Sequence, residues 1–501
     1  MPDRVPLPQR LIAGAALLLG IVLVYLPVVT SSFAYGDDFA IFFDGSSEFE
    51  EFVSAGRPGL VLADVTVHRW IREISHLKML RAIAIAGAVL LASIYFFLAR
   101  RWFHGPVSRL CFAIGIVTLP SVQEYIAGAH NWTFTTIAAL SSMSAIVARY
   151  AFEIATTRKS QTFSLLLAFA LMEAALLSYQ PAAMWYWPAT MFFVLDSRFL
   201  TSANYRRATL KVILAGLSFI ALGFVAMKVV LFLSQVTIQD RGELATNPIP
   251  KLYWFVRMQL TQGLNLWQIY SGNRYLMLGT ATLTALLVAS GYIVESLCRL
   301  RAGGRNLAAW IGLQLICATV VLLASHCHWL VVVNMTQNYR VAGALCAAVL
   351  VAVAWSVHRI VASCCGPDRG LRLEVVLFVA VAILSMLKCQ NNLQRYFIEP
   401  YGTGYRYVVA SLRSQLSPES THVHLIRQRR EDGLVTEELT QPFGWPFSIW
   451  ATDGLIDIAL HDAGVAHRVE QITASEDGEP IPDSPGTIVV DMRKLADFRL
   501  E

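Results

Sequence analysis

Long apolar runs separated by short polar connections are the main pattern along this chain. Residues 11–29 and 82–99 contain no Asp, Glu, Lys or Arg. Such runs approach the roughly 20 residues that a helix needs to cross about 30 Å of hydrocarbon. The pattern predicts eleven membrane-spanning helices, at residues 11–29, 82–99, 108–121, 132–148, 163–178, 182–195, 212–234, 275–296, 307–325, 341–357 and 374–388.

Two of these segments allow another interpretation. The stretch 163–195 is interrupted by Glu173 and Pro181, so it forms either two short helices or one broken helix. The first run follows the basic residues Arg4 and Arg10, as in a signal peptide. It is long for the apolar core of a signal peptide, however, and "SSFAYGDDF" is a poor cleavage site, which favours a retained span.

Composition and charge support a multi-spanning membrane protein and give it an orientation. The 501 residues are 55% hydrophobic and only 15% charged, whereas soluble domains carry nearer a quarter charged residues. With the N-terminus in the cytoplasm, Lys and Arg are roughly three times as dense in the short inner connections as in the outer loops. The net charge of +5 says little by itself, because basic residues in a membrane protein mostly mark the cytoplasmic side rather than a nucleic-acid site. This orientation places the first loop, residues 30–81, outside the cytoplasm.

The C-terminal residues differ in character from the rest. Residues 390–501 are polar, with β-like runs at 422–426 and 487–492 and helix-like stretches around 404–415 and 453–463. An odd number of spans also places them outside the cytoplasm. The sequence therefore predicts an all-α polytopic membrane domain, residues 1–389, followed by a small soluble α/β domain, residues 390–501, near the usual domain size.

Polar side chains of several kinds gather in the outer loops. The first loop carries the adjacent acids Asp37 and Asp38 and then Arg57 in a Gly-Arg-Pro-Gly turn. Apolar positions 67, 70, 71 and 74 fit an amphipathic helix lying in the membrane interface. Two later outer segments add further polar groups, namely "SYQP" with Tyr179 and Gln180, and "SHCHWLVVVNMTQNYR" with His326, His328, Asn334, Gln337, Tyr339 and Arg340.

Each of these features also has a plain structural explanation. Adjacent acids and a turn arginine are often only solvated, and aromatic residues near Tyr179 fit a membrane-interface belt. His326 and His328 form a weak metal pattern without further ligands. A Cys327–Cys389 disulfide is compatible with the topology alone. Glu173 and Lys228 lie in apolar segments, where ionisable groups suggest a function or face water.

The chemistry of sugar transfer gives a reason for combining these groups. A lipid-phosphate sugar donor places its phosphate at the membrane surface, and transfer needs a carboxylate that accepts a proton from the attacking hydroxyl. Charge that develops on the departing phosphate needs cations, and arginine binds phosphate with two hydrogen bonds. We expect the like-charged neighbour and partial burial to raise the pKa of one aspartate, which suits a base.

The order of a span, "GDDF", "AGRP", an interfacial helix and a later "SYQ" resembles bacterial type II, O-antigen-modifying membrane glucosyltransferases of the GT-C class. The resemblance covers the layout of about the first 400 residues and is specific at Asp37, Asp38, Arg57, Pro58, Tyr179 and Gln180. It implies catalysis by the two aspartates, donor binding by Arg57, and a structural or substrate role for Tyr179 and Gln180. Arg340 is added as a phosphate contact from its position. A divalent cation is left open.

The resulting hypothesis is an inner-membrane transferase that moves a hexose, glucose, from undecaprenyl phosphate to a surface polysaccharide such as O-antigen on the periplasmic side. Two alternatives remain open. A lipid-linked sugar transporter or flippase would need polar groups inside the spans and often a repeat of the fold. An O-antigen ligase or polymerase would be expected to carry basic residues in a large late outer loop, whereas this late loop has only about 15 residues.

Overall fold

The computed structural model describes residues 7–43, 52–236, 244–245, 247–269, 274–302, 307–333, 335, 338–365, 367–417, 420–427, 452–464, 469, 471–476, 486–492 and 494. Its helices up to residue 201 are α1 (Leu7–Thr30), α2 (Gly36–Phe43), α4 (Pro58–His68), η1 (Ile74–His76), α5 (Leu77–Ala99), α6 (Pro106–Val117), α7 (Pro120–Ala127), η2 (Ala129–Asn131), α8 (Phe134–Glu153), α9 (Arg158–Ser178), α10 (Gln180–Ala183), α11 (Tyr186–Val194) and α12 (Arg198–Thr201).

The remaining elements include a small sheet at the C-terminal end. They are α13 (Ala203–Ser234), α14 (Pro248–Trp254), η4 (Phe255–Leu260), α15 (Thr261–Leu264), α16 (Arg274–Ala302), α17 (Leu307–Ala324), α18 (Cys327–Val331), α19 (Tyr339–Cys365), α20 (Pro367–Leu393), η5 (Gln394–Ile398), α21 (Glu399–Gln415), β1 (His422–Arg427), α22 (Thr452–Ala463), β2 (Gln471–Glu476) and β3 (Thr487–Asp491). The predicted fold class, a mostly helical chain of membrane-spanning character with a small C-terminal α/β part, is confirmed.

The number of predicted spans is not confirmed. Within the described ranges, eight helices are long and apolar enough to cross a membrane, or nine if the bent pair α6 and α7 counts as one. This pair bends by 61°, and the bend falls where Pro120 begins α7 and holds Leu119 in an extended conformation. The predicted spans at 132–148 and 182–195 correspond to α8 and to α10 with α11, which are not among the eight.

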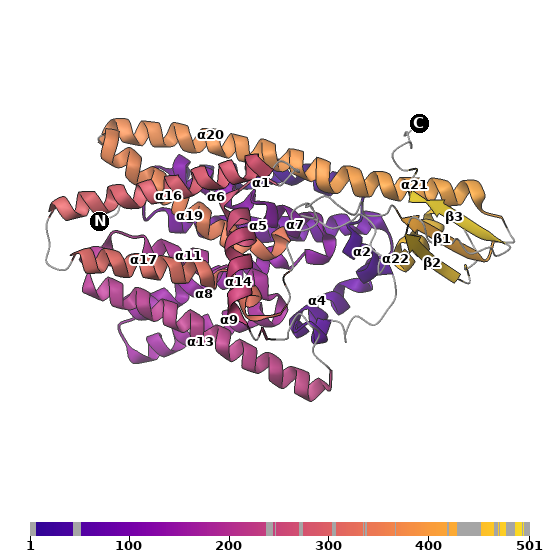
Figure 1. The fold of residues 1–501 in the computed structure, drawn as a ribbon, viewed down its shortest axis with the longest axis horizontal. Coiled ribbons are helices and arrows are strands. Elements are labelled where there is room, and N and C mark those ends of the chain that lie inside the picture. The colour runs from indigo at the N-terminus through magenta and orange to yellow at the C-terminus, as the bar shows by residue number, and fades with distance from the viewer. Residues whose placement is uncertain are drawn as a thin grey trace.

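The helix of the last predicted span continues beyond residue 389. α20, the π-helical turn η5 and α21 form one continuous helical segment that leads directly into the C-terminal part of the chain. Figure 1 shows this segment running along the molecule to the sheet. We call α21, α22 and the three strands the C-terminal unit. Its sheet has the order β2-β1-β3 with both pairs parallel.

The two faces of the sheet have different side chains. Val423 and Leu425 of β1 are buried, as are Ile488 and Val490 of β3, and all four belong to one apolar cluster. On the other face His424 of β1 is held through its ring nitrogens by hydroxyls of β2. This alternation is the period of two expected of a strand.

One predicted helix is not present. The prediction of an amphipathic helix around residues 67–74 is wrong, because α4 ends at His68 and the chain then turns. Ile71 and Ile74 are buried in the same apolar cluster as α2 and the C-terminal unit. These two side chains therefore pack against protein rather than against lipid. Pro58 begins α4 in the position where its missing N–H costs nothing.

Candidate functional site

The two acids of the first loop point in different directions. Both lie in the first turn of α2, where successive side chains are rotated by about 100°. The Asp38 side chain is completely buried, whereas the Asp37 side chain is 22% exposed. The two carboxylates are therefore not equivalent, and only Asp37 is open to a reactant from outside.

Asp38 ties three segments together. Its Oδ1 accepts hydrogen bonds from the His130 backbone N–H at 2.8 Å and contacts His130 Nδ1 at 2.7 Å. Its Oδ2 accepts the Tyr35 N–H at 2.9 Å and faces Arg81 Nη2 at 3.5 Å. Arg81 on α5 is itself fully buried. Asp38 thus joins α2 to α5 and η2, which is the arrangement of a structural carboxylate.

Arg81 is held in place by contacts of its own. Its Nη2 donates to the Phe33 carbonyl at 2.7 Å and its Nε donates to the Ala127 carbonyl at 2.9 Å. The guanidinium also lies 3.8 Å from the centre of the Phe33 ring. Because Arg81 binds both the segment before α2 and the last residue of α7, it sets the position of α2 relative to the helical bundle.

Asp37 lies between two cationic side chains. Its Oδ2 is 2.9 Å from Arg340 Nη1 and 3.3 Å from His130 Nε2. Burial alone would raise the pKa of Asp37, but the Arg340 charge and the hydrogen bond to His130 outweigh it and hold the pKa below its usual range. The expectation of a raised pKa is therefore wrong for Asp37, because the sequence did not show that Arg340 and His130 lie beside it.

A further buried acid holds Arg340. Glu124 of α7 is fully buried and accepts the backbone N–H of Arg340 at 3.0 Å. The Tyr35 hydroxyl reaches Glu124 Oε1 at 3.5 Å, and the Tyr125 hydroxyl donates to the Arg340 carbonyl at 2.6 Å. The start of α19 is thereby fixed, and the Arg340 guanidinium is directed at Asp37.

His130 is the link between the two aspartates. Burial alone would lower the pKa of His130, but its hydrogen bonds to Asp37 and Asp38 outweigh this and raise its pKa to about 9. The imidazole is therefore cationic near neutral pH, and its ring stacks on Tyr35 at 5.7 Å. We call Asp37, Asp38, His130, Arg340, Glu124 and Arg81 the acidic-pair cluster.

This arrangement predicts a loss of stability at alkaline pH. The folded-state pKa of His130 lies above the unfolded value of 6.5, so its contribution is complete below that value and is lost as the pH rises through about 9. The shift corresponds to on the order of 3 kcal/mol. We expect the unfolding midpoint to fall more steeply between pH 7 and 9.5 in the parent than in His130→Gln. The exposed His104→Gln variant should keep the parental slope, and equal slopes in all three proteins would contradict the prediction.

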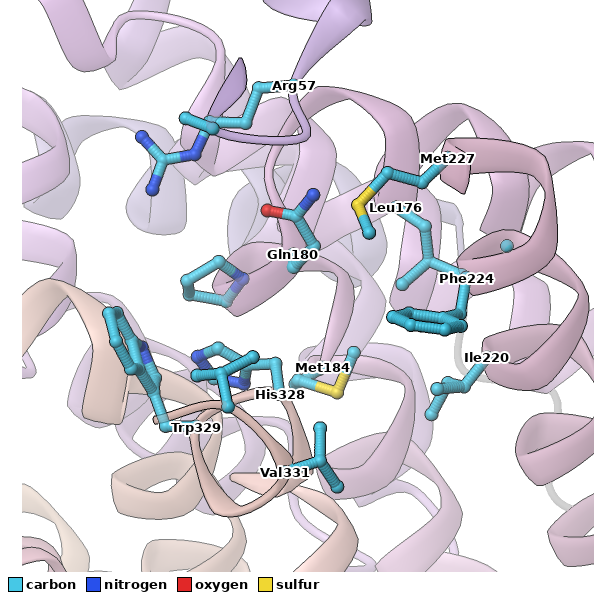
Figure 2. Close-up of a pocket in the computed structure, with 14 residues that line it drawn as sticks. Arg57, Leu176, Gln180, Met184, Ile220, Phe224, Met227, His328, Trp329 and Val331 are labelled. Atoms are coloured by element: carbon cyan, nitrogen blue, oxygen red, sulfur yellow. The ribbon is translucent and has the colours of Figure 1, made fainter. Parts of the chain in front are cut away.

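A second group of predicted residues surrounds a cavity of about 120 Å³. The cavity lies between α9, α13 and α18, and Figure 2 shows Arg57, Gln180 and His328 around it. We call it the Arg57 cavity. The other residues in its lining are Ala55, Leu176, Pro181, Met184, Ile220, Gly223, Phe224, Met227, Trp329, Val331 and Val332. An apolar lining with a few polar groups is typical of a site for an amphipathic ligand.

The turn before α4 is held against the start of α10. The Arg57 guanidinium lies over the Tyr179 ring, 4.8 Å from its centre, which is a cation–π geometry. The Gln180 side chain donates to the carbonyl of Gly56, which has a positive φ of 76°. A Cβ at residue 56 would also lie 2.5 Å from the Met227 sulfur. The positive φ therefore favours glycine at this turn, and any larger residue would also need the flexible Met227 side chain to shift.

Tyr125 connects the two groups. Its hydroxyl donates to the Arg340 carbonyl, and its ring packs edge-on against the Tyr179 ring at 6.3 Å. Tyr179 in turn stacks on Phe134 at 3.7 Å and carries Arg57 on its ring. Of the six predicted site residues, Asp37, Asp38 and Arg340 therefore lie in the acidic-pair cluster, and Arg57 and Gln180 line the Arg57 cavity. Tyr179 lies outside both groups and contacts Arg57 on one side and Tyr125 on the other.

Sequence reasoning missed His130, Glu124 and Arg81. The first two follow the third predicted span in "VQEYIAGAHNW", where buried polar residues crowd a short connection. That density of polar residues was the available signal. Arg81 lies one residue before a predicted span and looked like an ordinary flanking charge.

Other candidates have different environments. Within the described part of the chain, no group of three or more His, Cys, Asp or Glu side chains is placed to hold a metal ion. Cys327 and Cys389 are free thiols, so the disulfide that the topology allowed is not formed.

Burial lowers the pKa of His326 to about 3, so the imidazole is neutral. The Lys228 ammonium lies 5.4 Å from the Phe224 ring centre. Asn334 and Gln337 lie outside the described residues.

Comparisons with known proteins give only distant likenesses. No protein-family model and no curated protein matches the sequence. Among solved structures, the Archaeoglobus fulgidus oligosaccharyltransferase in complex with Zn and sulfate gives a TM-score of 0.45 at 12% identity, over 91% of this chain and 62% of that chain. ArnT from Cupriavidus metallidurans bound to undecaprenyl phosphate gives a TM-score of 0.41 at 14% identity, over 90% and 88%. These scores are too low to establish a shared fold, and they assign no activity to this chain.

Proposed function

We propose that this protein is a membrane glycosyltransferase of GT-C type that moves a hexose, glucose, from undecaprenyl phosphate to a surface polysaccharide such as O-antigen. The observation that carries the proposal is the partly exposed Asp37 carboxylate between Arg340 and His130. The carboxylate can act as the base for an attacking hydroxyl. The two cations beside it can stabilise the negative charge that develops on a departing phosphate. Its buried neighbours hold it in one place, as catalysis requires.

The proposed reaction is a single displacement at the anomeric carbon, with inversion. An acceptor hydroxyl oxygen forms the new bond to this carbon, the bond from the carbon to the phosphate oxygen breaks, and the hydroxyl proton passes to Asp37. The polyprenyl phosphate leaves with the bonding electrons. Arg340 neutralises the growing negative charge on it, because a guanidinium binds phosphate through two parallel hydrogen bonds.

The lowered pKa of Asp37 fits this sequence of events. Arg340 binds Asp37 at 2.9 Å, so a donor phosphate would compete with Asp37 for the same guanidinium. Once Arg340 turns to the phosphate, Asp37 loses the largest of the contacts that lower its pKa and becomes a better base. Donor binding would in this way activate the carboxylate, and Asp37 would be weakly basic without donor.

The Arg57 cavity is proposed to take part in donor binding. Its apolar walls suit the isoprenoid chain next to the phosphate, and Arg57 with Gln180 lies at its polar side. Tyr179 orients the Arg57 guanidinium through its ring face. The contact from Tyr179 through Tyr125 to the start of α19 would keep this side of the donor in register with Arg340.

The experiment that tests the function compares surface polysaccharide from cells with and without the protein. Mass spectrometry should show one added hexose per modified repeat only in cells that make the parent protein. Cells that make Asp37→Asn at the same membrane level are the matched control and should lack the added hexose. An unmodified polysaccharide together with a changed distribution of the lipid-linked sugar across the membrane would favour the transporter instead.

The lysine and arginine asymmetry predicts the orientation in the inner membrane, with the N-terminus in the cytoplasm. Reporter fusions at Asp44 and Ser417 should give a periplasmic signal, and a fusion at Gly303 a cytoplasmic one. The proposed chemistry needs the acids on the periplasmic side. A cytoplasmic signal at Asp44 would overturn the mechanism, because the acids would face the wrong compartment.

Donor binding should depend on the shape of Arg57 and not only on its charge. Lysine lacks the planar fork that stacks on Tyr179 and binds phosphate through two bonds. We expect Arg57→Lys to raise the KM for the lipid donor by about tenfold, with a smaller change in kcat. The exposed Arg69→Lys on the same outer segment is the control. Parental kinetics in Arg57→Lys would make Arg57 a structural residue of the turn.

A further inference from the structure

The helix that leaves the last span carries aromatic residues along one face. Phe397, Tyr401 and Tyr405 follow one another at intervals of four residues, which places them on one side of a helix. Phe397 belongs to the π-helical turn η5, and the other two belong to α21. All three are buried, with 0%, 1% and 8% of their surface exposed.

These rings meet two aromatic residues that flank the acidic pair. Tyr35 and Phe39 lie two residues before Asp37 and one residue after Asp38. The Tyr35 ring lies 5.8 Å from Phe397 and 4.9 Å from Tyr401. The Phe39 ring stacks on Tyr405 at 5.9 Å with an interplanar angle of 27°. These spacings are those of favourable aromatic pairs. We call the five residues the aromatic ladder.

The far end of the ladder is anchored in the C-terminal unit. The Tyr405 hydroxyl donates to Asp462 Oδ2 at 2.7 Å and lies 3.3 Å from the Ile458 carbonyl, both at α22. Phe39 also belongs to the apolar cluster that contains Leu455 of α22 and Val408 of α21. Figure 1 shows α2 beside α22, next to the sheet. One face of α2 therefore bears the acids, and the other is held by the C-terminal unit.

The near end of the ladder reaches the acidic-pair cluster. Tyr35 stacks on His130, and its hydroxyl contacts Glu124. A displacement of the final helix would therefore move Tyr35 and with it the ring that bridges the two aspartates. Reacting groups need to be held within about 0.5 Å of productive geometry, so rigid aromatic contacts on both sides of the acids have a direct consequence for reactivity.

We propose that the aromatic ladder makes the C-terminal unit a positioning device for the acidic pair, with Tyr405 and Phe39 as positioning residues. This inference rests on the proposed transferase function for its kinetic consequence, but not for its structural one. The C-terminal unit is then part of the active-site scaffold rather than an independent appendage. Without the ladder, α2 keeps its carboxylates but not their fixed orientation.

The test uses the full-length protein in lipid nanodiscs and compares Tyr405→Ala with Tyr405→Phe. Hydrogen exchange of residues 36–43 should be at least about tenfold faster in Tyr405→Ala. The kcat for transfer should fall at least about tenfold, while the KM for donor changes less than about twofold. Tyr405→Phe keeps the ring on Phe39 and loses only the hydroxyl contacts to α22, so it should recover most of both losses.

Val490→Ala is the matched control, because it trims the same apolar cluster at a residue of β3 that is not part of the ladder. It should leave exchange in residues 36–43 and kcat near parental values. Equal effects of Val490→Ala and Tyr405→Ala would overturn the proposal, as would parental exchange in Tyr405→Ala. If Tyr405→Ala does not fold, Phe39→Leu gives the same comparison from the other side of the stack. If the parent transfers no sugar, the proposed function fails, and the exchange measurement alone decides the ladder.

Discussion

Asp37→Asn should reduce turnover by about 10²–10⁴-fold, the usual contribution of a positioned general base. Asn has nearly the same size and still accepts a hydrogen bond from Arg340, but it cannot take the proton of the acceptor hydroxyl. Donor affinity should stay the same or increase, because Asn competes less well than a carboxylate for the Arg340 guanidinium. The expected signature is therefore a loss in kcat without a rise in KM.

The measurement is donor binding and single-turnover transfer with purified protein in nanodiscs. Glu73→Gln is a matched control, because Glu73 is an exposed acid of the same outer segment. It should behave like the parent in both assays. Near-parental single-turnover rates in Asp37→Asn would remove Asp37 from catalysis. The acidic-pair cluster would then be a structural network, and the transferase proposal would lose its chemical basis.

The sequence was informative where the environment restricts the type of side chain. Charged residues are rare in lipid, so the apolar runs located most spans. The lysine and arginine asymmetry assigned the loop that carries Asp37 to the outer side. The β-like runs now seen in β1 and β3 were visible because their residues alternate or are β-branched. Arg340 and Asp37 are 303 residues apart, and only their common assignment to the outer side suggested that they could meet.

The sequence failed where the identity of the neighbour decides the outcome. The periodicity at Ile71 and Ile74 was real, but it could not show that α2 and the C-terminal unit cover these residues instead of lipid. The pKa of Asp37 depends on Arg340 and His130, which come from distant segments.

Asp38→Asn should act in the opposite way, on folding rather than on chemistry. Asn can still accept the Tyr35 N–H, but it no longer neutralises Arg81, which is completely buried beside it. Breaking a buried ion pair by removing one partner typically costs about 3–5 kcal/mol, because the remaining charge is left uncompensated. The burial of Arg81 therefore makes Asp38→Asn a destabilising substitution.

The measurement is the unfolding midpoint and the yield of membrane-inserted protein, with Asp37→Asn in parallel. Asp38→Asn should lower both, whereas Asp37→Asn should lower them less, because Arg340 is 24% exposed and Asp38 still holds His130. The double variant Asp38→Asn/Arg81→Met removes the orphaned charge and should recover part of the lost stability. Parental stability in Asp38→Asn would show that the buried pair is not what holds α2. Loss of stability without recovery in the double variant would place the cost on the contacts of Asp38 with His130. Arg81 has two roles, because it pairs with Asp38 and also holds the carbonyls of Phe33 and Ala127 around the acidic pair. We therefore expect the double variant to recover only part of the stability and to keep a low turnover.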